Sequence, residues 1–117
     1  MRHLFVIRRG PHEGGRPQET LDVLLTLAAF DQTVDAVLLD AGVWQLHRDQ
    51  RAETLARKNI AVLWQALEIY GVDPPWVERE SLVERGLSEA DLVLPVRLLA
   101  RERFSGLLQD YDRVVGG

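Results

Sequence analysis

Cysteine is absent from this 117-residue sequence. The chain therefore forms no disulfide, has no cysteine-type zinc site and contains no thiol nucleophile. Histidine is also scarce, and His3, His12 and His47 show neither a His-x-x-x-His spacing nor an acidic ligand at a suitable spacing. We therefore expect no metal site and no cofactor.

The sequence also has little positive charge and no long apolar run. Its 14 lysines and arginines face 18 acidic residues, for a formal net charge of −4, whereas a general nucleic-acid binder is normally basic. No apolar run approaches the length of a membrane span, and residues 4–7 are too short for the core of a signal peptide. We expect one cytoplasmic domain over residues 1–117 with no membrane contact, because this length supports a single core.

Short apolar runs alternate with helical patterns along the chain. Strands are predicted over residues 3–7, 34–39, 76–78, 92–94 and 113–115, and helices over 17–30, 51–70, 80–86 and 96–109. Gly71 and Gly86 end two of these helices. The alternation predicts an α/β fold, a three-layer α/β/α sandwich around a mainly parallel sheet of about five strands.

The segment from Asp40 to Leu46 is too apolar for an ordinary loop. It follows the strand predicted over residues 34–39, and in α/β sheets ligands and partners usually meet the loops beyond the strand carboxyl ends. We therefore predict that this segment contacts a partner protein, chiefly through Trp44 and Leu46. The candidate interface residues of the segment are Asp40, Val43, Trp44, Gln45 and Leu46.

The helix predicted over residues 17–30 carries two apolar stripes, although a helix that covers a sheet needs only one. The stripe expected to lie on the sheet consists of Leu21, Leu24, Leu25 and Ala28. Val23, Leu27 and Phe30 lie nearly opposite, where either a partner protein or a neighbouring helix covers them.

The helix predicted over residues 51–70 has one core stripe, formed by Ala56, Ile60, Leu63, Leu67 and Tyr70. Trp64 lies beside this stripe, near Arg57 and Glu68. It either anchors an interface or covers the edge of the core.

Three arginines lie in the turn from Arg8 to Arg16, which either holds an anion or is a mobile surface turn. The turn lacks the glycine spacing and the Lys-Ser/Thr ending of the familiar phosphate loops. Asp40 and Glu78 each end a predicted strand without an obvious acid–base partner, and each is more often a cap or rim residue. A phosphoacceptor role for Asp40 would require an acidic pair after the first strand and a late lysine, but the only lysine is Lys58.

The run Asp-Ala-Gly-Val-Trp-Gln-Leu at residues 40–46 resembles the Asp-Gly-Val-aromatic-Gln-Leu signature of the TusC/DsrF subunits, in the DsrE/F-like sulfur-relay family. Ala41 is an insertion or a register difference relative to that signature. Further similar segments occur, in the order and spacing of the family, at residues 15–21, 69–71, 76–77, 81–87 and 110–112. The resemblance therefore covers almost the whole chain.

This resemblance implies a DsrE/F-like fold and a place in a sulfur relay. In the family, subunits of the TusB/DsrH, TusC/DsrF and TusD/DsrE kinds assemble as a heterohexamer, and the TusD/DsrE-like subunit carries a persulfide on a cysteine just beyond the third strand. Glu78 lies near that position here, and a carboxylate forms no persulfide. The implied role is a companion subunit without activity alone, which serves 2-thiolation of the tRNA wobble uridine or, in the Dsr branch, sulfur oxidation.

Two other classes remain open from the residues alone. One is a stand-alone flavodoxin-like protein that binds a nucleotide or flavin through the Arg8 to Arg16 turn. The other is a degenerate receiver-like signalling module centred on Asp40.

Overall fold

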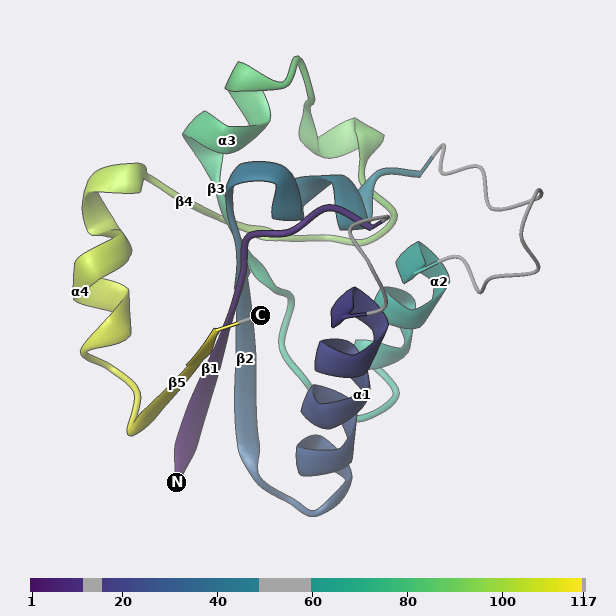
Figure 1. Cartoon of the computed structure of the whole chain (residues 1–117), viewed down its shortest axis with the longest axis vertical. Helices are drawn as coiled ribbons and strands as arrows, with labels where there is room; N and C mark the ends of the chain where they lie inside the picture. The colour runs from purple at the N-terminus through teal and green to yellow at the C-terminus, as the bar shows by residue number, and fades with distance from the viewer. Residues whose placement is uncertain (12–15, 49–59, 117) are drawn as a thin grey trace.

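A computed structural model of the chain describes residues 1–11, 16–48 and 60–116. Within these ranges, five parallel strands form one sheet in the order β4-β3-β2-β1-β5 (Figure 1). The strands are β1 (Arg2–Ile7), β2 (Thr33–Leu38), β3 (Trp76–Glu78), β4 (Arg97–Leu99) and β5 (Arg113–Gly116). The helices are α1 (Arg16–Ala29), α2 (Ile60–Trp64), α3 (Arg79–Glu84) and α4 (Phe104–Leu108).

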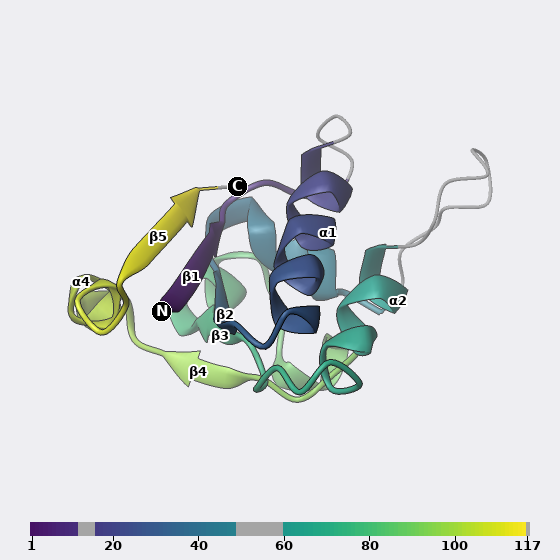
Figure 2. The same cartoon turned by 90° about the horizontal axis from the view of Figure 1, so that it is seen from below.

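Helices cover both faces of this sheet. Figure 2 shows α1 and α2 on one face and α4 on the other, and Figure 1 shows α3 above the carboxyl ends of the strands. β1 and β2 are buried along almost their whole length because both of their faces are covered. The predicted three-layer α/β sandwich with a parallel sheet is confirmed.

The core is divided by the sheet because successive strand residues point to opposite faces. Phe5 and Ile7 of β1 join Leu24 of α1 in the larger cluster. Leu4 and Val6 join Leu107 of α4 in the smaller one. The alternating side chains of β1 therefore contribute to the hydrophobic core on both faces of the sheet.

Four of the five predicted strands are confirmed, but the one expected at residues 92–94 is wrong. The fourth strand is Arg97–Leu99, which lies inside the helix that was predicted over residues 96–109. Leu92 forms only an isolated antiparallel bridge with His47. Arg97 is accommodated in a strand because its guanidinium lies 4.2 Å from the Trp76 ring centroid and 3.0 Å from an Asp35 carboxylate oxygen.

The helix expected from residue 51 is described only from Ile60, since residues 49–59, including Ala56 and Arg57, lie outside the described ranges. One side-chain prediction for it is wrong, since Tyr70 was expected in the core and is 45% exposed. Trp64 is completely buried, which favours the core over an interface among its two alternatives. Gly71 ends the helical segment with φ of 74°, as expected for a residue after a helix.

No helix among the described residues has the length and apolar character needed to cross a membrane.

Candidate functional site

Side chains from several strand ends meet at the carboxyl edge of the sheet. Arg8 directly follows β1, Asp40 comes two residues after β2, and Glu78 ends β3. Arg101 comes two residues after β4. Parallel strands bring these positions to one edge, which is where α/β proteins usually bind ligands and partners.

Glu78 is the buried carboxylate of this edge, with only 3% of its side chain exposed. The Ser81 hydroxyl donates to Glu78 Oε1 at 2.6 Å and accepts a hydrogen bond from the Asp40 backbone N–H at 2.8 Å. Ser81 lies in the first turn of α3, so this chain of bonds joins the ends of β2 and β3 to the helix above them.

Arg101 neutralises Glu78. Its Nε and Nη2 atoms donate to Glu78 Oε1 at 3.0 and 2.9 Å, and Nη2 also reaches Glu84 Oε1 at 2.8 Å. These hydrogen bonds, first to Glu84 and then to Glu78, raise the pKa of Arg101 above its already high ordinary value. The buried carboxylate is therefore paired and hydrogen-bonded, which is the condition under which a buried charge is tolerated.

Arg101 also fixes the two acidic residues on α3. Its backbone N–H donates to Glu80 Oε1 at 2.9 Å and lowers the pKa of that carboxyl. Its side chain lowers the pKa of Glu84 in the same way. The Arg101 side chain is still 47% exposed, so this positively charged residue at the edge is accessible from outside.

Asp40 pairs with Arg8 at 3.1 Å, with both side chains about half exposed. The Arg8 guanidinium also lies 5.5 Å from the ring centroid of Phe104 on α4. An exposed pair of this kind contributes little to stability. Its effect is to turn Arg8 toward the α4 face of the sheet.

The segment Asp40–Leu46 is a 3-10 helix that packs into the chain's own core. At Gly42 a Cβ atom would lie 2.1 Å from the carbonyl oxygen of Ile7, so this turn approaches β1 closely. Gln45 is buried, where it accepts a bond from Trp64 Nε1 at 2.9 Å and donates to the Arg9 carbonyl at 2.8 Å. The segment thus joins α2 to the end of β1.

The predicted partner contacts of this segment therefore need correction. Val43, Gln45, Leu46 and Trp64 are buried within the chain and have almost no side-chain surface to offer a partner. The apolar character of the segment reflects packing of the 3-10 helix into the chain's own core. The partly exposed candidates are Asp40, Trp44 and Leu27, together with Val23, which is 52% exposed.

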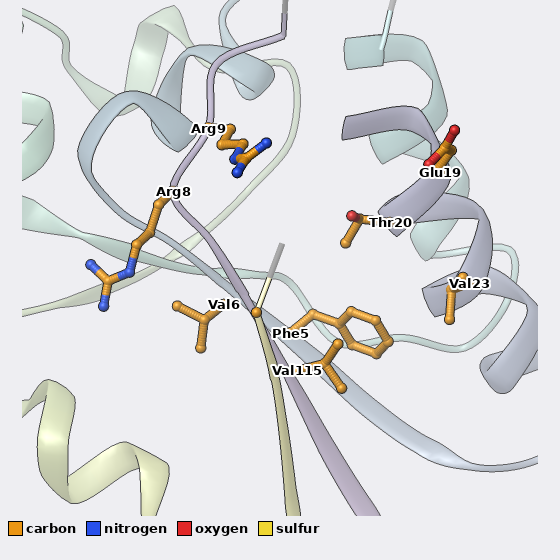
Figure 3. A pocket seen from close by; sticks show the side chains of 9 residues that line it. Phe5, Val6, Arg8, Arg9, Glu19, Thr20, Val23 and Val115 are labelled. Atoms are coloured by element: carbon orange, nitrogen blue, oxygen red, sulfur yellow. The ribbon is translucent and has the colours of Figure 1, made fainter. Parts of the chain in front are cut away.

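The structure describes the Arg8 to Arg16 turn only at its two ends, because residues 12–15 lie outside the described ranges. It brings Arg8, Asp40 and Glu78 to one edge, as the topology predicts. The first two arginines of the turn, Arg8 and Arg9, have different surroundings. Figure 3 shows Arg8 pointing away from α1 and Arg9 pointing toward it.

Arg101 is the site residue that sequence reasoning missed. The helix predicted over residues 96–109 concealed the strand end that carries it. A strand ending at Leu99 would have indicated that Arg101 follows at the same edge as Glu78. No local pattern identifies Arg97–Leu99 as a strand, since it has one charged residue and no β-branched residue.

These features define a class of protein: a parallel α/β sandwich whose carboxyl edge carries a fixed, ion-paired carboxylate. The model of the DsrE/DsrF-like family matches residues 1–116, and the chain belongs to that family. The resemblance found in the sequence is confirmed.

Two relatives show how much of the chain this likeness covers. The chain is 39% identical over 112 residues to the Protein TusC homolog of Pseudomonas aeruginosa, which covers 96% of this chain and 94% of that protein. It is 39% identical over 90 residues to the intracellular sulfur oxidation protein DsrF of Allochromatium vinosum, covering 77% of this chain and 66% of that protein.

Two solved structures share the fold. The ychN protein from E. coli aligns with a TM-score of 0.86 at 17% identity, covering 100% of this chain and 99% of that chain. The protein of unknown function MTH1491 from Methanobacterium thermoautotrophicum aligns with a TM-score of 0.67 at 16% identity, covering 99% and 98%. At these identities the likeness shows the fold alone.

Proposed function

We propose that this chain is a non-catalytic subunit of a sulfur-relay complex of the TusBCD or DsrEFH type, and that it supports persulfide transfer for 2-thiolation of the tRNA wobble uridine. Family membership and the 39% identity to a TusC homolog support the sulfur-relay assignment. The observation that carries the non-catalytic role is Glu78, which is buried and paired with Arg101 in a sequence without cysteine.

The chemistry of Glu78 supports this role. Persulfide transfer needs a thiolate as nucleophile and sulfur carrier, and a carboxylate held by Arg101 and Ser81 supplies neither. The catalytic cysteine then belongs to a homologous TusD/DsrE-like subunit, with a TusB/DsrH-like subunit as the third component. The chain contributes surface and charge to the assembly.

The exposed arginines at the carboxyl edge give this chain a means of acting on a partner's site. Arg101 is fixed by three glutamates and remains half exposed. A fixed cation beside a partner's persulfide would favour its anionic form, because an adjacent positive charge stabilises a thiolate. Any contact with tRNA is indirect, since the chain has a net charge of −4.

The test of this proposal is co-expression with TusB/DsrH-like and TusD/DsrE-like proteins from the same genome. We expect one stable heterohexamer that contains all three chains, measured by native mass spectrometry. A chain that stays separate from both proteins contradicts the proposal. A melting temperature that rises with flavin or nucleotide would favour the stand-alone binding protein.

The sulfur-oxidation branch is the second candidate, because the DsrF of Allochromatium vinosum is as identical to this chain over a shorter alignment. Deletion of the gene separates the two branches. Loss of 2-thiouridine from tRNA indicates the thiolation branch, and loss of sulfur oxidation with intact 2-thiouridine indicates the other.

A further inference from the structure

β5 is an edge strand with unpaired backbone groups on its outer side. It pairs only with β1 among the described strands. The Asp112 N–H donates to the Arg2 carbonyl at 2.9 Å, and residues two apart in a strand turn their backbone groups to the same side. Val114 and Gly116 therefore also face β1, while Arg113 and Val115 turn their N–H and C=O groups outward. An edge of this kind is a template for one more strand.

A groove lies beside this edge at the carboxyl ends of β1 and β5, and its lining extends from α1 across to Val6 and Arg8. It encloses about 550 Å³ between β5 and α1. Its apolar lining consists of Phe5, Val6, Val23 and Val115, of which Phe5, Val23 and Val115 lie on the α1 side (Figure 3). Because Val115 also turns its backbone outward, the groove and the unpaired edge are continuous.

Arg9 provides a positive charge at the end of the groove where the parallel strands finish. Its backbone is anchored, because the buried Gln45 side chain donates to the Arg9 carbonyl at 2.8 Å. Within the described ranges no carboxylate forms an ion pair with the Arg9 guanidinium, whereas Arg8 pairs with Asp40. Figure 3 shows Arg9 reaching toward the α1 side, where Thr20 faces the pocket, and Arg8 turned the opposite way.

We propose that this groove binds an extended segment of a partner protein as a sixth strand parallel to β5. One apolar side chain of the segment enters the pocket formed by Phe5, Val115 and Val23, and a carboxylate at the segment's carboxyl end pairs with Arg9. The proposal rests on the proposed function in one respect, that the segment comes from another subunit of the complex.

Two observations determine the direction and the charge of the segment. Arg9 follows β1 beyond its carboxyl end, and β5 runs parallel to β1, so only a parallel segment brings its carboxyl end to Arg9. Glu19 also lines the groove and places one negative charge across it from Arg9. The site therefore favours a segment with a single carboxylate near its end and disfavours one with several.

The test uses the purified full chain and a pool of random hexapeptides with free carboxyl termini. Peptides retained by the immobilised chain are sequenced, and one is resynthesised as the free acid and as the amide. We expect an apolar residue within the last three positions. Amidation and Arg9→Ala are each expected to weaken binding about tenfold, measured by fluorescence anisotropy, because each removes a charge-assisted hydrogen bond.

Three variants serve as controls. Arg8 also lines the groove, but its guanidinium pairs with Asp40 and points away from α1, so Arg8→Ala is expected to weaken peptide binding much less than Arg9→Ala. Glu19→Gln is expected to tighten binding of the free acid. Val115→Pro is expected to weaken binding more than Val115→Ala, since it also removes an outward N–H without removing a bond to β1.

The proposal is overturned if no peptide is retained above the level of blank beads. It is also overturned if acid and amide bind equally, or if Arg9→Ala and Arg8→Ala have the same effect. Because the chain is tested alone, these results are independent of whether it assembles with sulfur-relay subunits.

Discussion

At the residue scale, the carboxyl edge depends on the pairing of Glu78. One oxygen of this buried carboxylate accepts bonds from Ser81 and from two nitrogens of Arg101. Removing a partner of a buried charge costs more than the pair itself contributes, because the remaining charge stays buried and unpaired. Arg101 is therefore expected to matter for stability as well as for the charge of the edge.

Arg101→Ala is expected to lower the free energy of unfolding, because the Glu78 carboxylate would stay buried without its cation. The matched control is Arg103→Ala, an exposed arginine of the same 3-10 turn, with an expected change within about 0.5 kcal/mol. Urea unfolding of both variants measures the difference. Equal losses would show that Arg101 does not stabilise Glu78.

A second buried carboxylate, that of Asp35, makes the stability of the chain depend on pH through its bond with Tyr111. Asp35 accepts a bond from the Tyr111 hydroxyl at 2.6 Å, and burial together with this bond raises the pKa of Tyr111 to about 12. The folded chain thus favours the neutral phenol. Its contribution to stability is present in full below the ordinary pKa of 10.0 and is lost as the pH rises toward 12.

Tyr111→Phe tests this dependence. The stability difference between the original chain and the variant is expected to be largest below pH 10 and to shrink between pH 10 and 12. Urea unfolding at a series of pH values measures it. A difference that stays constant over this interval would contradict the role assigned to the phenol.

At the element scale, the 3-10 helix Asp40–Leu46 shows which features were predictable. Its apolar sequence correctly indicated a special segment at the carboxyl edge. Whether Leu46 and Gln45 face a partner or the core depends on α2, which supplies Trp64 to bond with Gln45. That contact joins residues 19 positions apart, and no local pattern shows it.

β1, β2, β3 and β5 were predictable because each has an apolar or β-branched run with turn residues around it. β4 was not, since Arg97 is stabilised in a strand by Asp35 and Trp76, which lie far from it in sequence. Because the fourth strand was predicted at residues 92–94, Arg101 was not recognised as a residue just beyond a strand end. Glu78 was found because it ends a strand that could be recognised locally.

The close approach of the 3-10 helix to β1 gives a test at this scale. Gly42→Ala is expected to lower the free energy of unfolding by about 1–3 kcal/mol, because the new methyl group meets the Ile7 carbonyl. Gly106→Ala is the matched control. It places a methyl group in open space on α4 and is expected to raise stability by up to about 1 kcal/mol, the helix preference for alanine. Similar effects of the two changes would contradict the packing described for Gly42.

At the scale of the whole molecule, the outer face of α1 remains the best candidate for contact with another subunit. Val23 is 52% exposed and Phe30, directly after the helix, is 73% exposed, while Leu21 and Leu24 of α1 are buried. This second stripe was expected to be covered either by a partner protein or by a neighbouring helix. Within the chain only Leu27 of the stripe is partly covered by the core. Exposed apolar stripes of this kind commonly mark protein interfaces.

Val23→Ser is therefore expected to weaken assembly with the homologous subunits while leaving the melting temperature of the isolated chain nearly unchanged. Val83→Ser is the control, since Val83 is also a valine and is even more exposed, at 71%, on α3. Native mass spectrometry of the co-expressed complex measures assembly. Equal assembly of both variants would place the interface elsewhere.

On the proposed function, this chain serves a sulfur relay without carrying sulfur itself. The most direct measurement is incubation of the purified complex, and of this chain alone, with a cysteine desulfurase and sulfur-labelled cysteine. We expect label that is released by reductant on a cysteine-bearing partner subunit, and none on this chain in either sample. Label on this chain alone that survives washing and is released by reductant would contradict it.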